Sequence, residues 1–212
     1  PFHMWAPDVY QGAPTPVTAF MAVGPKAASL AAFYRIMSET MPELSYSWEI
    51  LLCVISVLSM FIGNLGAIMQ TNIKRLLAFS SVAHVGYLII AIIAKNSLSA
   101  SSLMFYMLTY AFMVFGIFSI VILLGRKGEE NLELENYSGL AYKHPIIALT
   151  MTIFLLSLGG LPPLAGFVAK FYIFSAALKE GYLLLVIIAV LNSAISFYYY
   201  LKVIVFMYMK EP

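Results

Sequence analysis

Two lysines lie near the middle of apolar stretches that are long enough to cross a membrane. Lys26 lies within residues 17–38, and Lys170 lies within residues 146–178. On insertion scales, a charged side chain at the centre of a bilayer costs about 2.5–3.5 kcal/mol, and charged groups at that depth generally serve ions, protons or substrates. We therefore predict that Lys26 and Lys170 belong to a path for charge through a membrane.

Proline directly precedes Lys26, in the sequence Gly24-Pro25-Lys26. A proline inside a helix removes a backbone donor and clashes with the preceding turn, so we predict a kink whose freed carbonyl groups lie close to the lysine. The alternative is that Lys26 extends to the membrane surface, as long charged side chains do near helix ends. Its position near the centre of the stretch favours the path.

The stretch around Lys170 contains a cluster of helix-breaking residues. They are Gly159, Gly160, Pro162 and Pro163. Because a helix does not run unbroken through such a cluster, we predict two half-helices joined by an irregular segment at residues 159–166, near the middle of the membrane. Irregular backbone at that depth needs protein or water around it, and transporters place ion sites at such breaks. A kink with a purely structural role is the alternative.

A polar stripe runs along a third apolar stretch and contains Ser80, His84 and Tyr87. Spacings of four and three residues place these side chains on one face of a helix. Histidine changes charge near neutral pH, so a buried histidine can relay protons. A hydrogen bond between helices is the other role open to His84.

A second polar stripe is predicted to support the same path. It contains Asn192, Ser196, Tyr199 and Lys202, at spacings suited to one helix face. Lys202 lies nearer the end of its stretch and can also extend to the membrane surface. Hydroxyl groups of residues 98–125, among them Tyr106 and Tyr110, are expected to link helices to one another.

The composition is that of a membrane protein, because 62% of the residues are hydrophobic and only 10% are charged. Soluble domains carry about 25% charged residues. We predict an all-α polytopic membrane helix bundle, a single membrane domain with about six transmembrane spans. The predicted spans are residues 17–38, 48–69, 76–94, 98–125, 146–178 (broken at 159–166) and 182–209, and residues 1–16 are expected to form a loop on the cytoplasmic side.

The loops alternate in their content of lysine and arginine. Residues 70–75 and 125–145 and the tail with Lys210 are richer in basic residues than the loops between them. By the positive-inside rule, the richer set faces the cytoplasm. The chain begins with Pro1 and not with methionine, so we expect it to be a piece of a longer polytopic protein.

Several classes of site are excluded by the residues present. Cys53 is the single cysteine, which rules out an internal disulfide and a cysteine metal cage. The basic residues are scattered and form no patch for nucleic acid. The acidic residues lie in loops or at the ends of predicted spans, and a buried amine without a counter-ion disfavours its charged form. We predict that a partner carboxylate lies upstream of Pro1 or on a neighbouring subunit.

Three segments carry a resemblance to a known family. They are residues 1–17 (PFHMWAPDVYQGAPTPV), residues 71–87 (TNIKRLLAFSSVAHVGY) and residues 161–172 (LPPLAGFVAKFY). Together they resemble antiporter-like subunit N of respiratory complex I, the proton-translocating NADH:quinone oxidoreductase. The run PDVYQGAPTP is more similar to subunit N than to its relatives L and M.

The resemblance implies an antiporter-like fold with inverted repeats and a function in proton pumping. It implies that Lys26 and Lys170, the latter in the broken helix, are proton-path lysines with His84 as a relay between them. It implies that the chain itself binds no cofactor, and that quinone, NADH, FMN and iron–sulfur clusters belong to partner subunits. The implied surroundings are M-like and K-like membrane-arm subunits and the lipid bilayer of a bacterial inner membrane.

Two other functions are consistent with the sequence. One is a subunit of a multisubunit cation/proton antiporter, which shares the fold and would exchange sodium for protons without quinone. The other is a non-conducting structural spacer in the membrane arm, in which neutral residues could replace Lys26 and Lys170 without loss of function. The cost of burying two ammonium groups argues against the spacer.

Overall fold

A computed structural model describes residues 3–40, 45–125 and 132–211, and almost all of these residues are helical. The helices are α1 (Ala6–Gly12), α2 (Thr15–Arg35), α3 (Ser45–Ile68), α4 (Ile73–Ala94), α5 (Ser99–Leu124), α6 (Leu140–Lys143), α7 (Pro145–Gly159), α8 (Ala165–Lys179) and α9 (Leu183–Met209). A π-helical turn (Ile36–Thr40) continues α2, and a 3-10 turn (Leu134–Tyr137) precedes α6. The prediction of an all-α bundle is confirmed.

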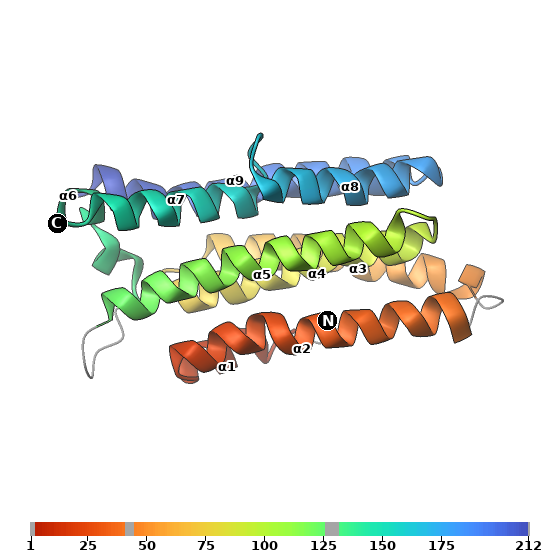
Figure 1. The fold of residues 1–212 in the computed structure, drawn as a ribbon, viewed down its shortest axis with the longest axis horizontal. Helices are drawn as coiled ribbons and strands as arrows, with labels where there is room; N and C mark the ends of the chain where they lie inside the picture. The colour runs from red at the N-terminus through yellow and green to blue at the C-terminus, as the bar shows by residue number, and fades with distance from the viewer. Residues whose placement is uncertain (1–2, 41–44, 126–131, 212) are drawn as a thin grey trace.

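The long helices have the length and composition of membrane spans. Within the described residues, 5 helices are long and apolar enough to cross a bilayer: Thr15–Ser38, Trp48–Ile68, Ile73–Ala94, Ser99–Leu124 and Leu183–Met209. The shorter helices α7 and α8, of 15 residues each, follow one another along one line beside α9 (Figure 1). Together they occupy the length of one span, so the chain is a multi-pass membrane protein with a discontinuous helix.

The helices form three layers, with α1 and α2 in one, α3, α4 and α5 in the middle, and α7, α8 and α9 in the third (Figure 1). Helices α2 and α4 begin at one end of the bundle, and helices α3, α5 and α9 finish there. We call this end the first end. The opposite end is the second end. The helix break between α7 and α8 lies between these two ends (Figure 1).

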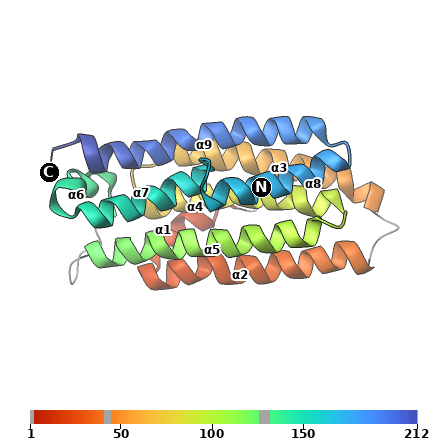
Figure 2. The ribbon, with the colours of Figure 1, turned by 45° about the horizontal axis from the view of Figure 1, so that its top comes forward.

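Helix α4 is the centre of the bundle, and 89% of its most apolar window is buried. It contacts α1, α3, α5, α8 and α9, and Figure 2 shows it enclosed by its neighbours. Helix α4 is apolar around most of its circumference, as expected for a helix that is surrounded by other helices. Polar groups on α4 are therefore placed inside the protein.

Small residues allow α3 and α4 to approach at backbone distance. A Cβ atom on Gly63 would lie 2.5 Å from the backbone nitrogen of Ala83, and one on Gly86 would lie 2.8 Å from the carbonyl oxygen of Ser56. The Ser56 hydroxyl donates to the carbonyl of Gly86 at 2.7 Å. Small residues and serine hydroxyls of this kind are what membrane helices use to associate, because lipid offers no hydrophobic driving force.

A buried amide pair links α3 to α9. The side-chain nitrogen of Asn64 donates to the backbone oxygen of Asn192 at 2.9 Å and to its side-chain oxygen at 3.1 Å. The Tyr199 hydroxyl donates to the side-chain oxygen of Asn64 at 3.0 Å. These bonds satisfy polar groups that would otherwise be unpaired in an apolar interior.

The expectation of a loop over residues 1–16 was wrong, because α1 lies within it. Pro7 stands at the start of α1, where its missing N–H costs nothing. Tyr10 is buried, and the α4 residue Arg75 donates through Nη1 to Asp8 at 2.6 Å and to Gln11 at 2.9 Å. The helix is stabilised by packing on α4, which the Pro- and Gly-rich composition did not indicate.

The irregular segment between α7 and α8 is shorter than predicted. It covers residues 160–164, since Gly159 still belongs to α7 and Gly166 already belongs to α8. Pro162 and Pro163 lie in this segment and are exposed. The two prolines therefore separate the half-helices without entering either of them.

The close contact of α3 and α4 can be tested by adding one methyl group. We expect Gly63→Ala to lower the melting temperature of the full-length protein, because the new Cβ would meet the α4 backbone at 2.5 Å. Overpacking of this kind costs about 1–3 kcal/mol. Thermal unfolding of the purified protein in detergent, followed by circular dichroism, measures the change.

Gly12→Ala is the matched control, because no atom lies within 4 Å of a Cβ on this helical glycine. Equal melting temperatures for the Gly63 and Gly12 variants would show that the contact between α3 and α4 is not tight.

Candidate functional site between the buried lysines

Lys170 is held at the break between α7 and α8. Only 4% of its surface is exposed, and its ammonium group donates to the carbonyl oxygen of Gly159 at 2.7 Å and to the Ser193 hydroxyl at 2.8 Å. Gly159 is the last residue of α7, so this carbonyl has no partner within its own helix and carries part of the negative end of the helix dipole. The helix break thus supplies the oxygen that accepts the buried ammonium.

Two glycines shape the break around Lys170. Gly160 has a φ of 94°, a conformation that favours glycine, and a Cβ there would lie 3.1 Å from Cδ of Lys170. A Cβ on Gly166 would lie 1.7 Å from the carbonyl oxygen of Ser157, whose hydroxyl accepts a hydrogen bond from the Gly166 N–H at 3.0 Å. Close packing of α8 on the end of α7 fixes the position from which Lys170 extends.

Lys26 extends from α2 toward the middle layer. Its ammonium group donates to the Tyr110 hydroxyl at 3.0 Å and to the hydroxyl of Ser81, and it lies 4.5 Å from the centre of the Tyr110 ring. The alternative of an extension to the membrane surface does not match this arrangement, in which the ammonium group contacts α4 and α5. Lys26 also lines a cavity of about 570 Å³ together with Tyr10 and Ser29.

The two ammonium groups share one chemical feature. The recorded acceptors of Lys26 and Lys170 are hydroxyl and carbonyl oxygens, and within the described part of the chain neither forms an ion pair with a carboxylate. Neutral acceptors stabilise an ammonium less than a carboxylate does.

His84 lies in α4 and is 2% exposed. Its Nδ1 atom lies 2.5 Å from the Tyr106 hydroxyl, and its Nε2 atom lies 3.1 Å from the Tyr200 hydroxyl. The Tyr200 hydroxyl lies 2.5 Å from the hydroxyl of Ser80. Both ring nitrogens are thus hydrogen-bonded, one to α5 and one to α9.

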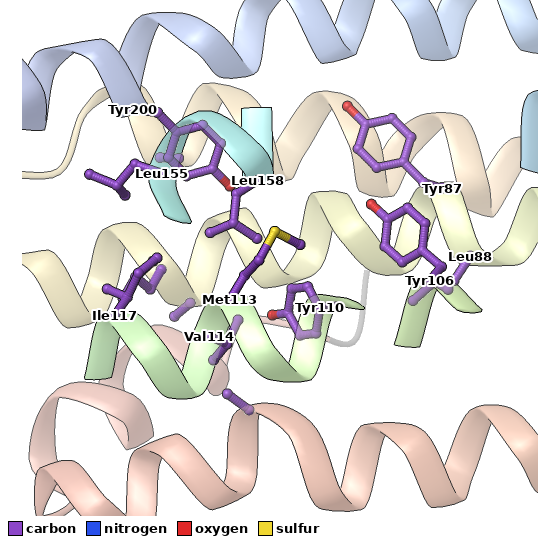
Figure 3. Close-up of a cluster of buried hydrophobic side chains, with 14 of the residues drawn as sticks. Tyr87, Leu88, Tyr106, Tyr110, Met113, Val114, Ile117, Leu155, Leu158 and Tyr200 are labelled. Atoms are coloured by element: carbon purple, nitrogen blue, oxygen red, sulfur yellow. The ribbon is translucent and has the colours of Figure 1, made fainter. Parts of the chain in front are cut away.

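Aromatic rings connect His84 to the surroundings of both lysines. The ring centre of His84 lies 5.1 Å from that of Tyr110, which binds Lys26, and 5.9 Å from that of Tyr87. The ammonium group of Lys170 lies 5.1 Å from the centre of the Tyr87 ring. Figure 3 shows Tyr87, Tyr106, Tyr110 and Tyr200 in the interior between the ribbons. Lys26, His84 and Lys170 therefore form a row across the bundle, which we call the lysine row.

The remaining predicted polar residues occupy other places. Asn192 binds Asn64, as described above, and the Ser196 hydroxyl donates to the backbone oxygen of Ser193 in its own helix at 2.6 Å. Lys202 donates to the backbone oxygen of Gln70, just beyond the end of α3, at 3.1 Å. The contacts of these side chains are thus with residues outside the lysine row.

Tyr106 and Tyr200 were not predicted as site residues, although both bind His84. Tyr106 belongs to a stripe of hydroxyls that was read as a link between helices. Tyr200 lies in the run Tyr198-Tyr199-Tyr200, where spacing alone does not show which ring faces the interior. The spacing of four residues between Ser80 and His84 did predict that these two members of the cluster share one face of a helix.

The groups in this site are of kinds that can accept and donate protons, and the described residues offer no evident metal site. Among the described residues, no group of three or more histidine, cysteine, aspartate or glutamate side chains is placed to hold a metal ion. Amines, imidazole and hydroxyl groups each act as proton donors and, in their neutral forms, as acceptors. The arrangement is suited to proton transfer.

Comparison with known proteins finds similar chains among NADH-quinone oxidoreductase subunits and Mrp complexes. Residues 1–196 match the family described as "NADH:quinone oxidoreductase/Mrp antiporter, TM". The NADH-quinone oxidoreductase subunit N of Trichlorobacter lovleyi is 52% identical over 210 residues, which cover 99% of this chain and 43% of that protein. The chain thus spans less than half the length of this curated relative.

Solved structures show the same arrangement of helices. A chain of respiratory complex I from Thermus thermophilus superimposes with a TM-score of 0.85 and 40% identity, over 100% of this chain and 46% of that chain. A chain of the Mrp complex from a Dietzia species gives a TM-score of 0.88 with 28% identity, over 98% of this chain and 39% of that chain. With residues 1–196 matched, the chain belongs to the NADH:quinone oxidoreductase/Mrp antiporter family of transmembrane proteins.

Proposed function

We propose that the chain is part of a proton-translocating membrane-arm subunit of an NADH:quinone oxidoreductase, and that Lys26, His84 and Lys170 carry the proton. The observation that carries this proposal is the lysine row itself. Within the described residues, the buried ammonium of Lys170 and the half-buried Lys26 are held by neutral oxygens, and a histidine with both nitrogens hydrogen-bonded lies between them.

Burial in the membrane makes the charged form of each amine costly. We therefore propose that each lysine of the row holds a proton transiently and passes it on. Burial favours the neutral form of an amine, whereas hydrogen bonds to oxygen acceptors favour its charged form. Lys26 has Tyr110 and Ser81, and Lys170 has the carbonyl at the helix break. Small changes at these acceptors shift the balance between the two forms of each amine.

The energy for transport comes from outside this chain in the proposed function. Moving one elementary charge against 100 mV costs about 2.3 kcal/mol. We propose that quinone reduction in partner subunits, which hold the NADH, FMN, iron–sulfur and quinone sites, supplies it. The M-like and K-like membrane-arm subunits are the proposed neighbours, and a bacterial inner membrane is the proposed location.

We also propose that the first end of the bundle faces the cytoplasm. Basic residues near that end are Lys74, Arg75, Lys143, Lys202 and Lys210, and those near the second end are Arg35, Lys95 and Lys179. The excess of lysine and arginine at the first end supports this orientation. Arg126 and Lys127, which belong to the predicted basic loop of residues 125–145, lie outside the described residues.

Removing either lysine tests the proposal. In the full-length subunit, assembled in its complex, we expect Lys26→Ala and Lys170→Ala each to lower the rate of donor-driven proton pumping at least about tenfold, because positioned proton carriers contribute factors of this size or more. Coupled electron transfer to quinone should fall with it. Pumping in inverted membrane vesicles and quinone reduction are measured in parallel.

Lys179→Ala is the matched control, since Lys179 lies in the same helix as Lys170 but is exposed at its end. Pumping at the wild-type rate in both buried-lysine variants would overturn the proposal and favour a structural spacer.

The alternative of a cation/proton antiporter is favoured by the structural likeness to the Mrp complex. The higher identity to complex I sequences supports the first proposal. We expect proton movement to require a reductant and quinone and to proceed at an unchanged rate when sodium is replaced by choline. Proton movement driven by a sodium gradient in the absence of quinone would establish the antiporter instead.

A further inference from the structure

A chain of hydrogen bonds crosses the lysine row at His84. It consists of Tyr106 in α5, His84 in α4, Tyr200 in α9 and Ser80 in α4, with distances of 2.5, 3.1 and 2.5 Å between successive polar atoms. Each of these four residues is at most 2% exposed. Three helices therefore contribute to one continuous polar chain in the interior.

This chain runs along the long axis of the bundle. Ser80 precedes His84 by one helical turn on α4, which begins at the first end, so Ser80 lies on that side of the histidine. Tyr106 lies in the first half of α5, which begins at the second end. Figure 3 likewise shows Tyr200 and Tyr106 at different positions along the bundle. The lysine row, in contrast, crosses the bundle from α2 to α8.

The hydroxyl groups of the chain contribute hydrogen bonds rather than packing. A phenylalanine ring would fill nearly the same space as Tyr106 or Tyr200, and a hydroxyl is buried in an apolar interior only at a cost that a hydrogen bond offsets. Both hydroxyls bind the same imidazole, one at each nitrogen. Within the described part of the chain, His84 is thus the only titratable group to which the hydroxyls of Tyr106 and Tyr200 are both hydrogen-bonded.

We propose that Tyr106, His84, Tyr200 and Ser80 form a proton-conducting branch that runs along the bundle and joins the lysine row at His84. This inference rests on the proposed function and adds Tyr106 and Tyr200 to the proton path. It gives His84 a route toward each end of the bundle that does not pass through either lysine.

The chain has two arrangements of its hydrogens. In one, Tyr106 donates to Nδ1 of His84, Nε2 donates to Tyr200, and Tyr200 donates to Ser80. In the other, all three bonds are reversed. Neutral imidazole has one donor and one acceptor nitrogen, and each hydroxyl can take either role, so both arrangements satisfy every bond.

One proton passes when the first arrangement becomes the second. A proton that binds the Tyr106 oxygen releases the hydroxyl proton of Tyr106 to Nδ1. Nε2 gives its proton to Tyr200, Tyr200 gives its proton to Ser80, and Ser80 releases its own proton in the direction of the first end. One proton is taken up and one is released, His84 changes tautomer, and no electron is transferred. The reverse sequence carries a proton back.

Two adjacent tyrosines of α9 provide a matched experiment. Tyr199 and Tyr200 are both fully buried, with ring centres 4.5 Å apart, but the Tyr199 hydroxyl donates to Asn64, whereas the Tyr200 hydroxyl lies 3.1 Å from Nε2 of His84. Tyr200→Phe, Tyr106→Phe, Tyr199→Phe and Lys170→Ala are made in the full-length subunit and assembled in the complex. Donor-driven pumping in inverted vesicles is divided by the amount of assembled complex, determined on native gels, and repeated in deuterated water.

We expect Tyr200→Phe and Tyr106→Phe each to lower the pumping rate at least about tenfold, as for loss of a positioned proton carrier. Tyr199→Phe should pump at the wild-type rate. The solvent isotope effect should rise in the two slow variants, because a proton transfer becomes rate-limiting in them, and a merely structural defect would not change it.

Wild-type pumping in Tyr200→Phe and Tyr106→Phe, with loss of pumping in Lys170→Ala, would overturn the branch and leave the lysine row in place. Wild-type pumping in all variants would overturn the proposed function itself. An equal loss in Tyr199→Phe and Tyr200→Phe would also overturn the branch, since packing would then explain both. If Tyr200→Phe does not assemble, Tyr106→Phe on α5 decides the question by the same measurements.

Discussion

The hydrogen bond between the Lys170 ammonium and the carbonyl of Gly159 is the interaction on which the site depends. An isolated ammonium inside a membrane protein is costly, and a continuous helix has no free carbonyl to offer it. The break after α7 exposes such a carbonyl inside the bundle. The carbonyl freed by the break needs a hydrogen-bond donor, and the Lys170 ammonium needs an acceptor, so each group satisfies the other.

The position of α4 makes this arrangement part of a larger one. Gly63 and Gly86 bring α3 and α4 together, so α4 is enclosed and its polar side chains face other helices. His84 consequently contacts hydroxyls from α5 and α9, while Ser81 on the neighbouring side of α4 accepts from Lys26 of α2. A helix on the surface of the bundle could not offer polar groups to so many partners.

The three members of the lysine row could be predicted from the sequence, because each is a polar residue in an apolar stretch. The helix break was also predictable, since Gly160 and Pro162 act on the local backbone. Helix α1 was missed, because its stability comes from packing on Arg75 and α4 rather than from its own composition. Contacts such as His84 with Tyr200, 116 residues apart, depend on how helices pack, and no local pattern specifies them.

The electrostatics of the row give a reason for a branch at His84. Lys26 and Lys170 lie on opposite sides of the histidine, and positive charges repel one another strongly in a low-dielectric interior. A proton on either lysine therefore disfavours a second charge on the imidazole. Neutral His84 keeps one donor and one acceptor nitrogen, which are the forms that the Tyr106 and Tyr200 hydroxyls need for an unbroken chain. In the proposed branch, a charge on either lysine would thus favour the neutral form of His84 through which a proton passes along the bundle, and this would link occupancy of the row to conduction along the branch.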